Sequence, residues 1–242
     1  MLPVRMTTIF LIRHGLTAAT GSRLYGRAEG FHLDERGRAQ ADLLAARFAS
    51  VRLTAIYSSP LERCLETVEP LAAAQRLSVV RRPELIEMDA GAWTGRTLAS
   101  LRRTRLWRDV VRSPSTFRFP GGESFAEARA RVLGEVERIA RRHRRGRIAV
   151  ATHGDIVRML LADMTGTPLD SFQRIVIDPA SVSVVHIGGD DPHVFLVNDT
   201  GGGLERFGPS GTAAPWEAAT RAPRPLRRGP PTRRRDHPNL RG

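Results

Sequence analysis

The sequence predicts an α/β domain with a mainly parallel central sheet, and three observations favour this class. Short apolar runs alternate with longer segments of helical periodicity over the first 205 residues. Several of these runs end abruptly in polar clusters, as strands of a parallel sheet do at a binding edge. Of the 242 residues, 41% are apolar and 26% charged, which suits a globular core. No apolar run approaches the roughly 18 residues that a transmembrane helix needs.

Six segments are expected to form strands. The first, at 7–12, reads TTIFLI, a β-branched apolar run that is typical of a buried parallel strand. The strand at 147–152 reads RIAVAT and is followed at once by His153, Gly154 and Asp155. The remaining strands are predicted at 55–58, 77–80, 182–187 and 194–197.

Four longer segments carry apolar residues at helical spacing. In the segment 37–49, Ala41, Leu44, Ala45 and Phe48 fall on one face. Pro60 is expected to open a helix that runs to about residue 74, because proline suits the first helical turn. Further helices are predicted at 123–143 and 156–164.

The C-terminal segment differs in composition. Residues 206–242 hold nine arginines against Glu217 and Asp236, together with seven of the 16 prolines. Few apolar side chains remain to offset the entropy cost of ordering such a chain. We therefore expect a catalytic domain at 1–205 and a disordered tail at 206–242. Docking of the tail on an acidic partner or on nucleic acid is an alternative.

Charge and cysteine content restrict the class further. All 38 basic residues are arginine and the formal net charge is +13. About half of that charge lies in the tail, so nucleic acid is not an expected partner of the domain. Cys64 is the only cysteine, which excludes an intramolecular disulfide and a cysteine-rich zinc site. The N-terminal residues show no signal-peptide pattern, and we expect a cytoplasmic protein without membrane association.

Polar side chains that suit phosphoryl transfer follow three of the predicted strands. Arg13 and His14 end the first strand, Arg63 lies in the first turn after the second, and His153 follows the strand at 147–152. Glu87 lies in a loop after the third strand. Guanidinium groups match phosphoryl oxygens, neutral imidazole is a nucleophile, and a carboxyl group can protonate a leaving alcohol. Each residue alone also fits a structural role, but their joint placement favours a site.

These residues occur in motifs that resemble the histidine phosphatase superfamily, the group of the cofactor-dependent phosphoglycerate mutases and many small phosphatases. The motifs are LIRHGLT at 11–17, SSPLER at 58–63, the Glu87 loop and THG at 152–154, with LDERGRAQA at 33–41 and PGGES at 120–124. Residues 174–200 are also similar to an actinobacterial subgroup that is usually labelled probable phosphomutase. The resemblance implies a three-layer α/β/α fold of the phosphoglycerate mutase type.

The resemblance also implies roles for the five polar residues. His14 would be the nucleophile that forms a phosphohistidine. Arg13, Arg63 and His153 would bind the transferring phosphoryl group and stabilise its charge. Glu87 would protonate the leaving group and then activate water. No metal or other cofactor is expected, because arginines take the place of the usual cation.

Five further residues occupy positions that lie at the substrate in the family, and four of them match the family residue. Thr17, Tyr25 and Gly26 border the substrate in the family, and the backbone amide of Gly154 would complete the phosphate pocket. Family members commonly have asparagine six residues after the nucleophile, where this chain has Thr20. A threonine hydroxyl has a shorter reach and one donor instead of two, so phosphate affinity or substrate preference is expected to differ.

The spacing of the motifs favours a phosphatase over a mutase. Classical mutases of the family carry a long insertion between the acid and the second histidine, whereas Glu87 and His153 lie only 66 residues apart. The expected activity is hydrolysis of a small phosphorylated metabolite. A phosphomutase and a catalytically weak module that binds phosphorylated ligands are the alternatives, and the sequence does not predict an oligomeric state. Between Glu87 and His153, two groups of residues fit either contact with the substrate or an ordinary structural role. The arginines are Arg96, Arg102, Arg103 and Arg105. The aromatic residues are Trp93, Trp107, Phe117 and Phe119.

Overall fold

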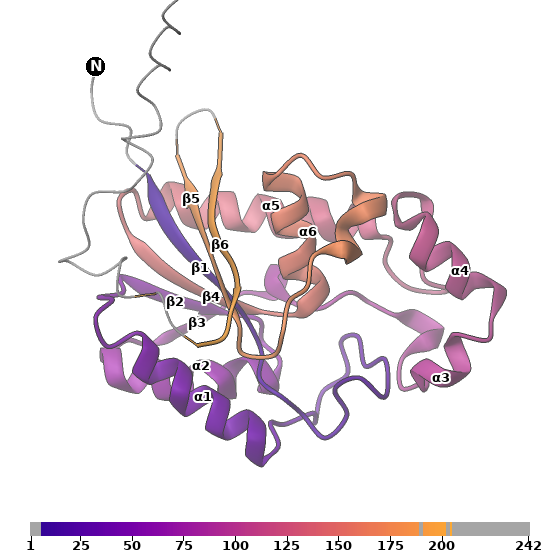
Figure 1. The fold of residues 1–242 in the computed structure, drawn as a ribbon, viewed down its shortest axis with the longest axis horizontal. Coiled ribbons are helices and arrows are strands. Elements are labelled where there is room, and N and C mark those ends of the chain that lie inside the picture. The colour runs from indigo at the N-terminus through magenta and orange to yellow at the C-terminus, as the bar shows by residue number, and fades with distance from the viewer. Residues whose placement is uncertain (1–5, 189–190, 202–203, 205–242) are drawn as a thin grey trace, which may run out of the picture. The chain divides into compact units, whose positions relative to one another are not determined.

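A six-stranded sheet forms the centre of the computed structural model, which describes residues 6–188, 191–201 and 204. The strand order is β3-β2-β4-β1-β5-β6 (Figure 1). The first four strands in this order are parallel, whereas β5 runs antiparallel to β1 and β6 antiparallel to β5. The strands are β1 (Thr7–Arg13), β2 (Ala55–Ser58), β3 (Val79–Arg81), β4 (Arg147–Thr152), β5 (Val182–Ile187) and β6 (His193–Asp199).

The central strand β1 is buried on both faces. Ile9, Phe10, Leu11 and Ile12 are all fully buried. Successive side chains of a strand point to opposite faces of the sheet, so both faces must be covered. Ile9 and Leu11 belong to one hydrophobic cluster, and Phe10 and Ile12 to a second. Two cores therefore flank the sheet.

Helices cover each core. α1 (Glu35–Arg47) and α2 (Glu62–Gln75) pack on one face, and α5 (Phe125–Arg142) and α6 (Gly154–Met164) on the other (Figure 1). This arrangement confirms the predicted three-layer α/β/α class with a mainly parallel sheet. Among the described residues, no helix is long and apolar enough to cross a membrane. The predicted tail at 206–242 lies outside the described residues.

Capping explains where the predicted helix boundaries were wrong. The helix expected from Pro60 begins at Glu62, because Leu61 keeps an extended backbone as its N-cap. α1 begins two residues before the predicted start, where the side chain of Asp34 accepts a hydrogen bond from the amide of Gly37. Ser124 and Glu127 form a capping box that starts α5 at Phe125. The third strand is also shifted, to Val79–Arg81.

The segment between β3 and α5 contains structure that the sequence reading did not predict. Two short helices, α3 (Leu98–Leu101) and α4 (Arg105–Arg112), lie here, capped by the hydroxyls of Thr97 and Thr104. Short 3₁₀ helices occur at Pro83–Leu85, Gly91–Trp93 and Pro114–Thr116, and a further one, Leu169–Arg174, follows α6. We call residues 83–124 the connecting segment, since they connect β3 to the next long helix.

Candidate active site

The carboxyl ends of the central strands bring the predicted residues together. His14 follows β1, and His153 follows β4 as the N-cap of α6. Arg13 and Thr152 are partners in the parallel register of these strands, so the two histidines that follow are neighbours, with ring centroids 5.3 Å apart. The carboxylate Oε2 of Glu87 lies 3.9 Å from Nδ1 of His153.

His14 is held as a neutral ring with one defined free nitrogen. Its Nδ1 lies 2.8 Å from the carbonyl oxygen of Gly15, which can only accept, so Nδ1 carries the proton and Nε2 keeps its lone pair. The side chain is buried, and burial together with the charges of Arg63 and Arg13 lowers the pKa of His14 to about 3. The imidazole is therefore uncharged near neutral pH.

His153 is fully buried behind this ring. Its Nε2 lies 2.8 Å from Oγ of Ser59, and burial lowers the pKa of His153 well below its ordinary value. Cys64 packs against the same ring, with Sγ 3.5 Å from Nε2. Burial raises the pKa of the Cys64 thiol to about 12, so this cysteine is a core side chain and no nucleophile.

Two buried guanidinium groups lie beside His14. Arg63 is 3% exposed and donates from Nη2 to the carbonyl of Gly26 over 2.9 Å. Arg13 donates from Nη1 to the carbonyl of Ile177 over 2.6 Å, whereas its buried Nε has no hydrogen-bond partner within the described part of the chain. Burial lowers the pKa of Arg13, but a guanidinium starts so far above neutrality that it stays charged. Both groups suit an anion.

Glu87 is a carboxyl group whose protonation changes near neutral pH. Burial and then the nearby charge of Asp155 raise the pKa of Glu87 to about 7. Its Oε1 accepts a hydrogen bond from the amide of Met88 over 2.9 Å. The group can therefore be present as an acid or as a base under the same conditions, which general acid–base chemistry requires.

These residues border one cavity of about 510 Å³. Its lining includes Arg13, His14, Arg63 and Glu87, whereas His153 lies behind it. The five predicted substrate residues also line it: Thr17, Thr20, Tyr25, Gly26 and Gly154.

Thr20 and Gly154 fill specific geometric requirements. The hydroxyl of Thr20 accepts from the amide of Thr17 and lies 3.0 Å from the Thr17 hydroxyl, so the two threonines act as one unit. Gly154 is the first residue of α6, and a Cβ there would lie only 3.2 Å from Nε of Arg13. Glycine thus lets the guanidinium approach the amino end of a helix, where an anion is stabilised.

The connecting segment supplies an apolar wall to the cavity. Trp93, Trp107 and Phe119 line it, and the two tryptophan rings stack with centroids 6.2 Å apart. Phe117 does not line the cavity and packs in the core instead. Of the four arginines that the sequence left open, only Arg102 lines the cavity, and all four are exposed.

Three charged lining residues were not predicted. Asp155 and Arg158 form an ion pair of 2.7 Å one turn into α6, and Arg23 lies in the loop after β1. Arg158 lies three residues after Asp155, and this spacing would have indicated it, because residues three apart share a helix face. Within the described residues, no group of three His, Cys, Asp or Glu side chains could hold a metal ion.

In this three-layer α/β/α fold, the strand ends and the loop after β3 gather two histidines, two arginines and a carboxyl group at one cavity. This combination of fold and site defines a class of phosphoryl-transfer enzymes. Comparison with known proteins identifies the family. The model of the histidine phosphatase superfamily (branch 1) matches residues 9–200, and the chain belongs to this family. It is therefore related to enzymes that are phosphatases and phosphoglycerate mutase-like proteins.

Some relatives are named as phosphatases and others as phosphoglycerate mutases. The chain is 34% identical over 187 residues to phosphoserine phosphatase 1 of Hydrogenobacter thermophilus, covering 75% of this chain and 87% of that protein. It is 30% identical over 183 residues to a probable phosphoglycerate mutase, GpmB, of Proteus mirabilis, covering 74% and 85%. The solved structure of Bacillus stearothermophilus YhfR is similar with a TM-score of 0.75 and 30% identity, covering 80% of this chain and 97% of that one.

Proposed function

We propose that the protein is a metal-independent phosphomonoesterase that hydrolyses a small phosphorylated metabolite through a phosphohistidine on His14. The observation that carries this proposal is the state of His14. Its ring is neutral, Nδ1–H is fixed on the carbonyl of Gly15, and the side chain lines the cavity beside Arg13 and Arg63. A nucleophile with a free lone pair next to two anion-binding groups suits attack on phosphorus.

In the first step, Nε2 of His14 attacks the phosphorus atom of the ester. An N–P bond forms while the P–O bond to the alcohol breaks. The electron pair of that bond leaves on the alcohol oxygen, which takes the proton of Glu87. Arg13, Arg63 and the amide of Gly154 bind the phosphoryl oxygens and stabilise their charge.

In the second step, water attacks the phosphohistidine. The Glu87 carboxylate accepts a proton from the water as its oxygen bonds to phosphorus, and the N–P bond breaks. His14 regains its neutral ring, Glu87 regains its proton, and inorganic phosphate leaves. A pKa of Glu87 of about 7 suits both directions of proton transfer.

The lining of the cavity supports a phosphatase over a mutase. Leu24, Trp93, Trp107 and Phe119 present apolar surface where the alcohol part of the ester would lie. Such a wall favours an alcohol with an apolar portion over a small, highly charged phosphoglycerate. The phosphomutase remains the second candidate, because it uses the same phosphohistidine and because the relative from Proteus mirabilis carries that name.

The deciding experiment measures phosphate release from a panel of phosphomonoesters in excess EDTA, with each reaction also checked for an isomerised ester. We expect EDTA-resistant release by the wild type and none by His14→Ala. A labelled ester should leave an acid-labile phosphoenzyme on the wild type alone. His32→Ala is the matched control, since His32 is an exposed histidine that does not line the cavity.

The other outcomes are equally informative. Isomer formation without net release would establish the mutase. Binding of esters without any turnover would establish the module that only binds phosphorylated ligands. Undiminished turnover by His14→Ala would overturn the mechanism.

A further inference from the structure

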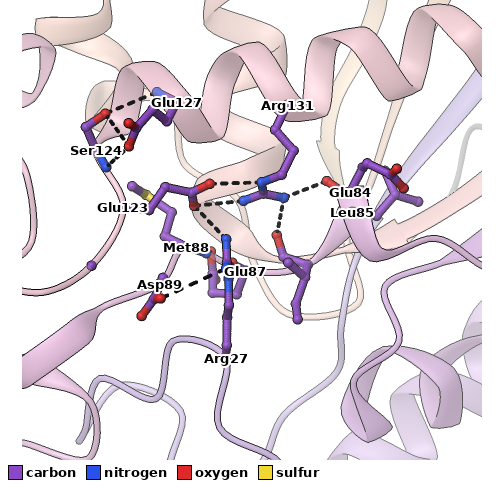
Figure 2. Close-up of polar contacts among 12 residues, drawn as sticks. Arg27, Glu84, Leu85, Glu87, Met88, Asp89, Glu123, Ser124, Glu127 and Arg131 are labelled. Atoms are coloured by element: carbon purple, nitrogen blue, oxygen red, sulfur yellow. Dashed lines mark hydrogen bonds and ion pairs between the residues drawn. The ribbon is translucent and has the colours of Figure 1, made fainter.

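Three charged residues outside the cavity converge on the loop that carries Glu87. Arg131 projects from α5 toward this loop, Glu123 precedes α5, and Arg27 lies in the segment after β1 (Figure 2). None of the three lines the cavity. We call Arg27, Glu123 and Arg131 the loop clamp.

Arg131 holds the chain just before Glu87. Its Nη1 donates to the carbonyl oxygens of Glu84 and Ile86, over 2.6 and 3.0 Å. Its Nε and Nη2 donate to the two carboxylate oxygens of Glu123, each over 2.9 Å. This geometry uses the planar fork of a guanidinium, which a lysine could not reproduce.

Arg27 holds Glu87 itself. Its Nε donates to the carbonyl oxygen of Glu87 over 3.0 Å, and its Nη2 lies 3.0 Å from Oε2 of Glu123. The carboxylate of Glu123 therefore joins the two guanidinium groups that hold the backbone before and at Glu87 (Figure 2).

The segment before α5 completes the contact after Glu87. The amide of Glu123 donates to the carbonyl of Asp89 over 3.0 Å. At Gly122, a Cβ would lie 2.3 Å from that same carbonyl oxygen, so only glycine permits this approach. The PGGES segment at 120–124 thus has a specific task, which is to place Glu123 against the loop.

Two of the three clamp residues are largely enclosed. The side chains of Glu123 and Arg131 are 12% and 18% exposed, whereas that of Arg27 is 35% exposed. Charges that are largely withdrawn from water must keep their partners, because an unpaired one is strongly unfavourable. The loop backbone is therefore tied to α5 by bonds that cannot be exchanged for water at low cost.

We propose that the loop clamp positions Glu87 for proton transfer to the leaving alcohol, with Arg27, Glu123 and Arg131 acting as positioning residues and touching no substrate. This inference rests on the proposed acid role of Glu87. Leu85 and Met88 are buried on either side of Glu87 and anchor the loop in the core. The clamp binds backbone carbonyl groups before and at Glu87 and so fixes the backbone torsion angles there. Those torsion angles set the direction in which the Glu87 side chain leaves the backbone.

The test compares two esters that differ in their need for an acid. p-Nitrophenyl phosphate has a leaving group that needs little protonation, whereas glycerol 2-phosphate has one that needs it. For Arg131→Met we expect kcat/KM on glycerol 2-phosphate to fall on the order of 100-fold, the effect of displacing a reacting group by about 1 Å. The ratio kcat/KM is compared because it reports the steps up to release of the alcohol, whereas hydrolysis of the phosphohistidine is common to both esters. The fall on p-nitrophenyl phosphate should be several-fold smaller. Glu123→Gln, which keeps the shape of the side chain, should show the same selectivity.

A double-mutant cycle separates positioning from folding. In a Glu87→Gln background, Arg131→Met should cause no further selective loss on glycerol 2-phosphate, because the acid is already absent. Arg129→Met is the matched control, because Arg129 lies on the same helix as Arg131 but pairs with Asp163 of α6 instead of the loop. This variant should leave both activities unchanged.

Each contrary result has a distinct meaning. Equal losses on both esters by Arg131→Met and Glu123→Gln would overturn the clamp while leaving the proposed function intact. If Arg131→Met does not fold, Glu123→Gln and Arg27→Gln decide the question by the same ratio. If Glu87→Gln itself lowers kcat/KM equally on both esters, the acid role fails, and the clamp proposal fails with it.

Discussion

Glu87 gains its chemistry from its surroundings. A free glutamate is ionised at neutral pH, whereas burial and Asp155 raise the pKa of Glu87 to about 7. Burial and the charges of Arg63 and Arg13 lower the pKa of His14 to about 3. Near pH 7 His14 is therefore neutral, while Glu87 is present both as acid and as carboxylate. The neutral pair is the combination of acid and nucleophile that the proposed first step uses.

A cost in stability accompanies this raised pKa. As the pH rises from about 4.5 to about 7, the unfolded chain releases the Glu87 proton before the folded protein does, so the folded state loses stability across this window. Glu87→Gln removes that loss. We expect the variant to unfold at a higher temperature than the wild type at pH 8, with the difference shrinking toward pH 5.

Thermal unfolding at both pH values measures this effect. Glu137→Gln serves as the control, because Glu137 is an exposed residue of α5, paired only with the exposed Arg141. A difference between Glu87→Gln and the wild type that does not change with pH would contradict the raised pKa.

At the level of single residues, the sequence predicted which side chains meet but not their states. Arg13, His14, Arg63, Glu87 and His153 follow strand ends or a nearby loop, so topology alone brings them together. The protonation of Glu87 depends on burial and on Asp155, which no sequence pattern expresses. The clamp residue Arg131 is one of several arginines in a helical pattern, and nothing in that pattern distinguishes it.

The paired strands β1 and β4 determine how the two histidines face each other. The amide of His14 donates to the carbonyl of Thr152 over 3.0 Å, which continues the ladder one residue past β1. Since side chains of a strand alternate with a period of two, a slip of one residue would turn His14 to the opposite face of the sheet. The fully buried apolar residues of β1 fix the register against such a slip.

The amino end of α6 offers a test of the close approach at Gly154. For Gly154→Ala we expect kcat to fall about 10-fold or more, since the new Cβ must push the Arg13 guanidinium by a few tenths of an ångström. Gly134→Ala in α5 is the matched control, because the added methyl group would meet nothing within 4 Å beyond the backbone of its own helix and its chain neighbours. That variant should keep full activity and gain about 0.5–1 kcal/mol of stability. Full activity in Gly154→Ala would contradict the role of the approach.

Prediction of elements was accurate where patterns were long and failed where they were short. The long helices and the buried strands were found from periodicity, with errors of about two residues that caps such as Leu61 explain. α3 and α4 were missed because helices of four and eight residues show too little periodicity. Their caps, Thr97 and Thr104, were the available signal.

At the scale of the whole molecule, every residue proposed to take part in catalysis precedes residue 160. The last cavity-lining residue is Gln173. We therefore expect a chain that ends at Phe207 to keep the kcat and KM of the full chain, measured on the best ester of the panel. A large fall in kcat would show that the segment 208–242 contributes to the reaction.

Leu204 marks how far the truncation can go. Its side chain is fully buried against the core beside α1 and α2. Leu204→Ala should lower the free energy of unfolding by about 2–5 kcal/mol, the range for buried leucine, with kcat unchanged. Chemical denaturation of this variant beside the Phe207 truncation separates loss of core from loss of tail.

The origin of the two halves of the cavity has a consequence for how substrate range can change. The side that binds the phosphoryl group comes from the ends of β1 and β4, from α2 and α6, and from Glu87. The apolar side comes mainly from residues 90–119 of the connecting segment. Substitution of Trp93, Trp107 or Phe119 would therefore change the side of the cavity that contacts the alcohol, provided that the core packing of Trp93 and Phe119 is kept. The loop clamp closes both ends of that segment onto α5, through Glu87 and Glu123. The protein is thus divided into a fixed reaction centre and a replaceable selector, and variation confined to the selector would diversify the alcohols accepted while preserving the chemistry.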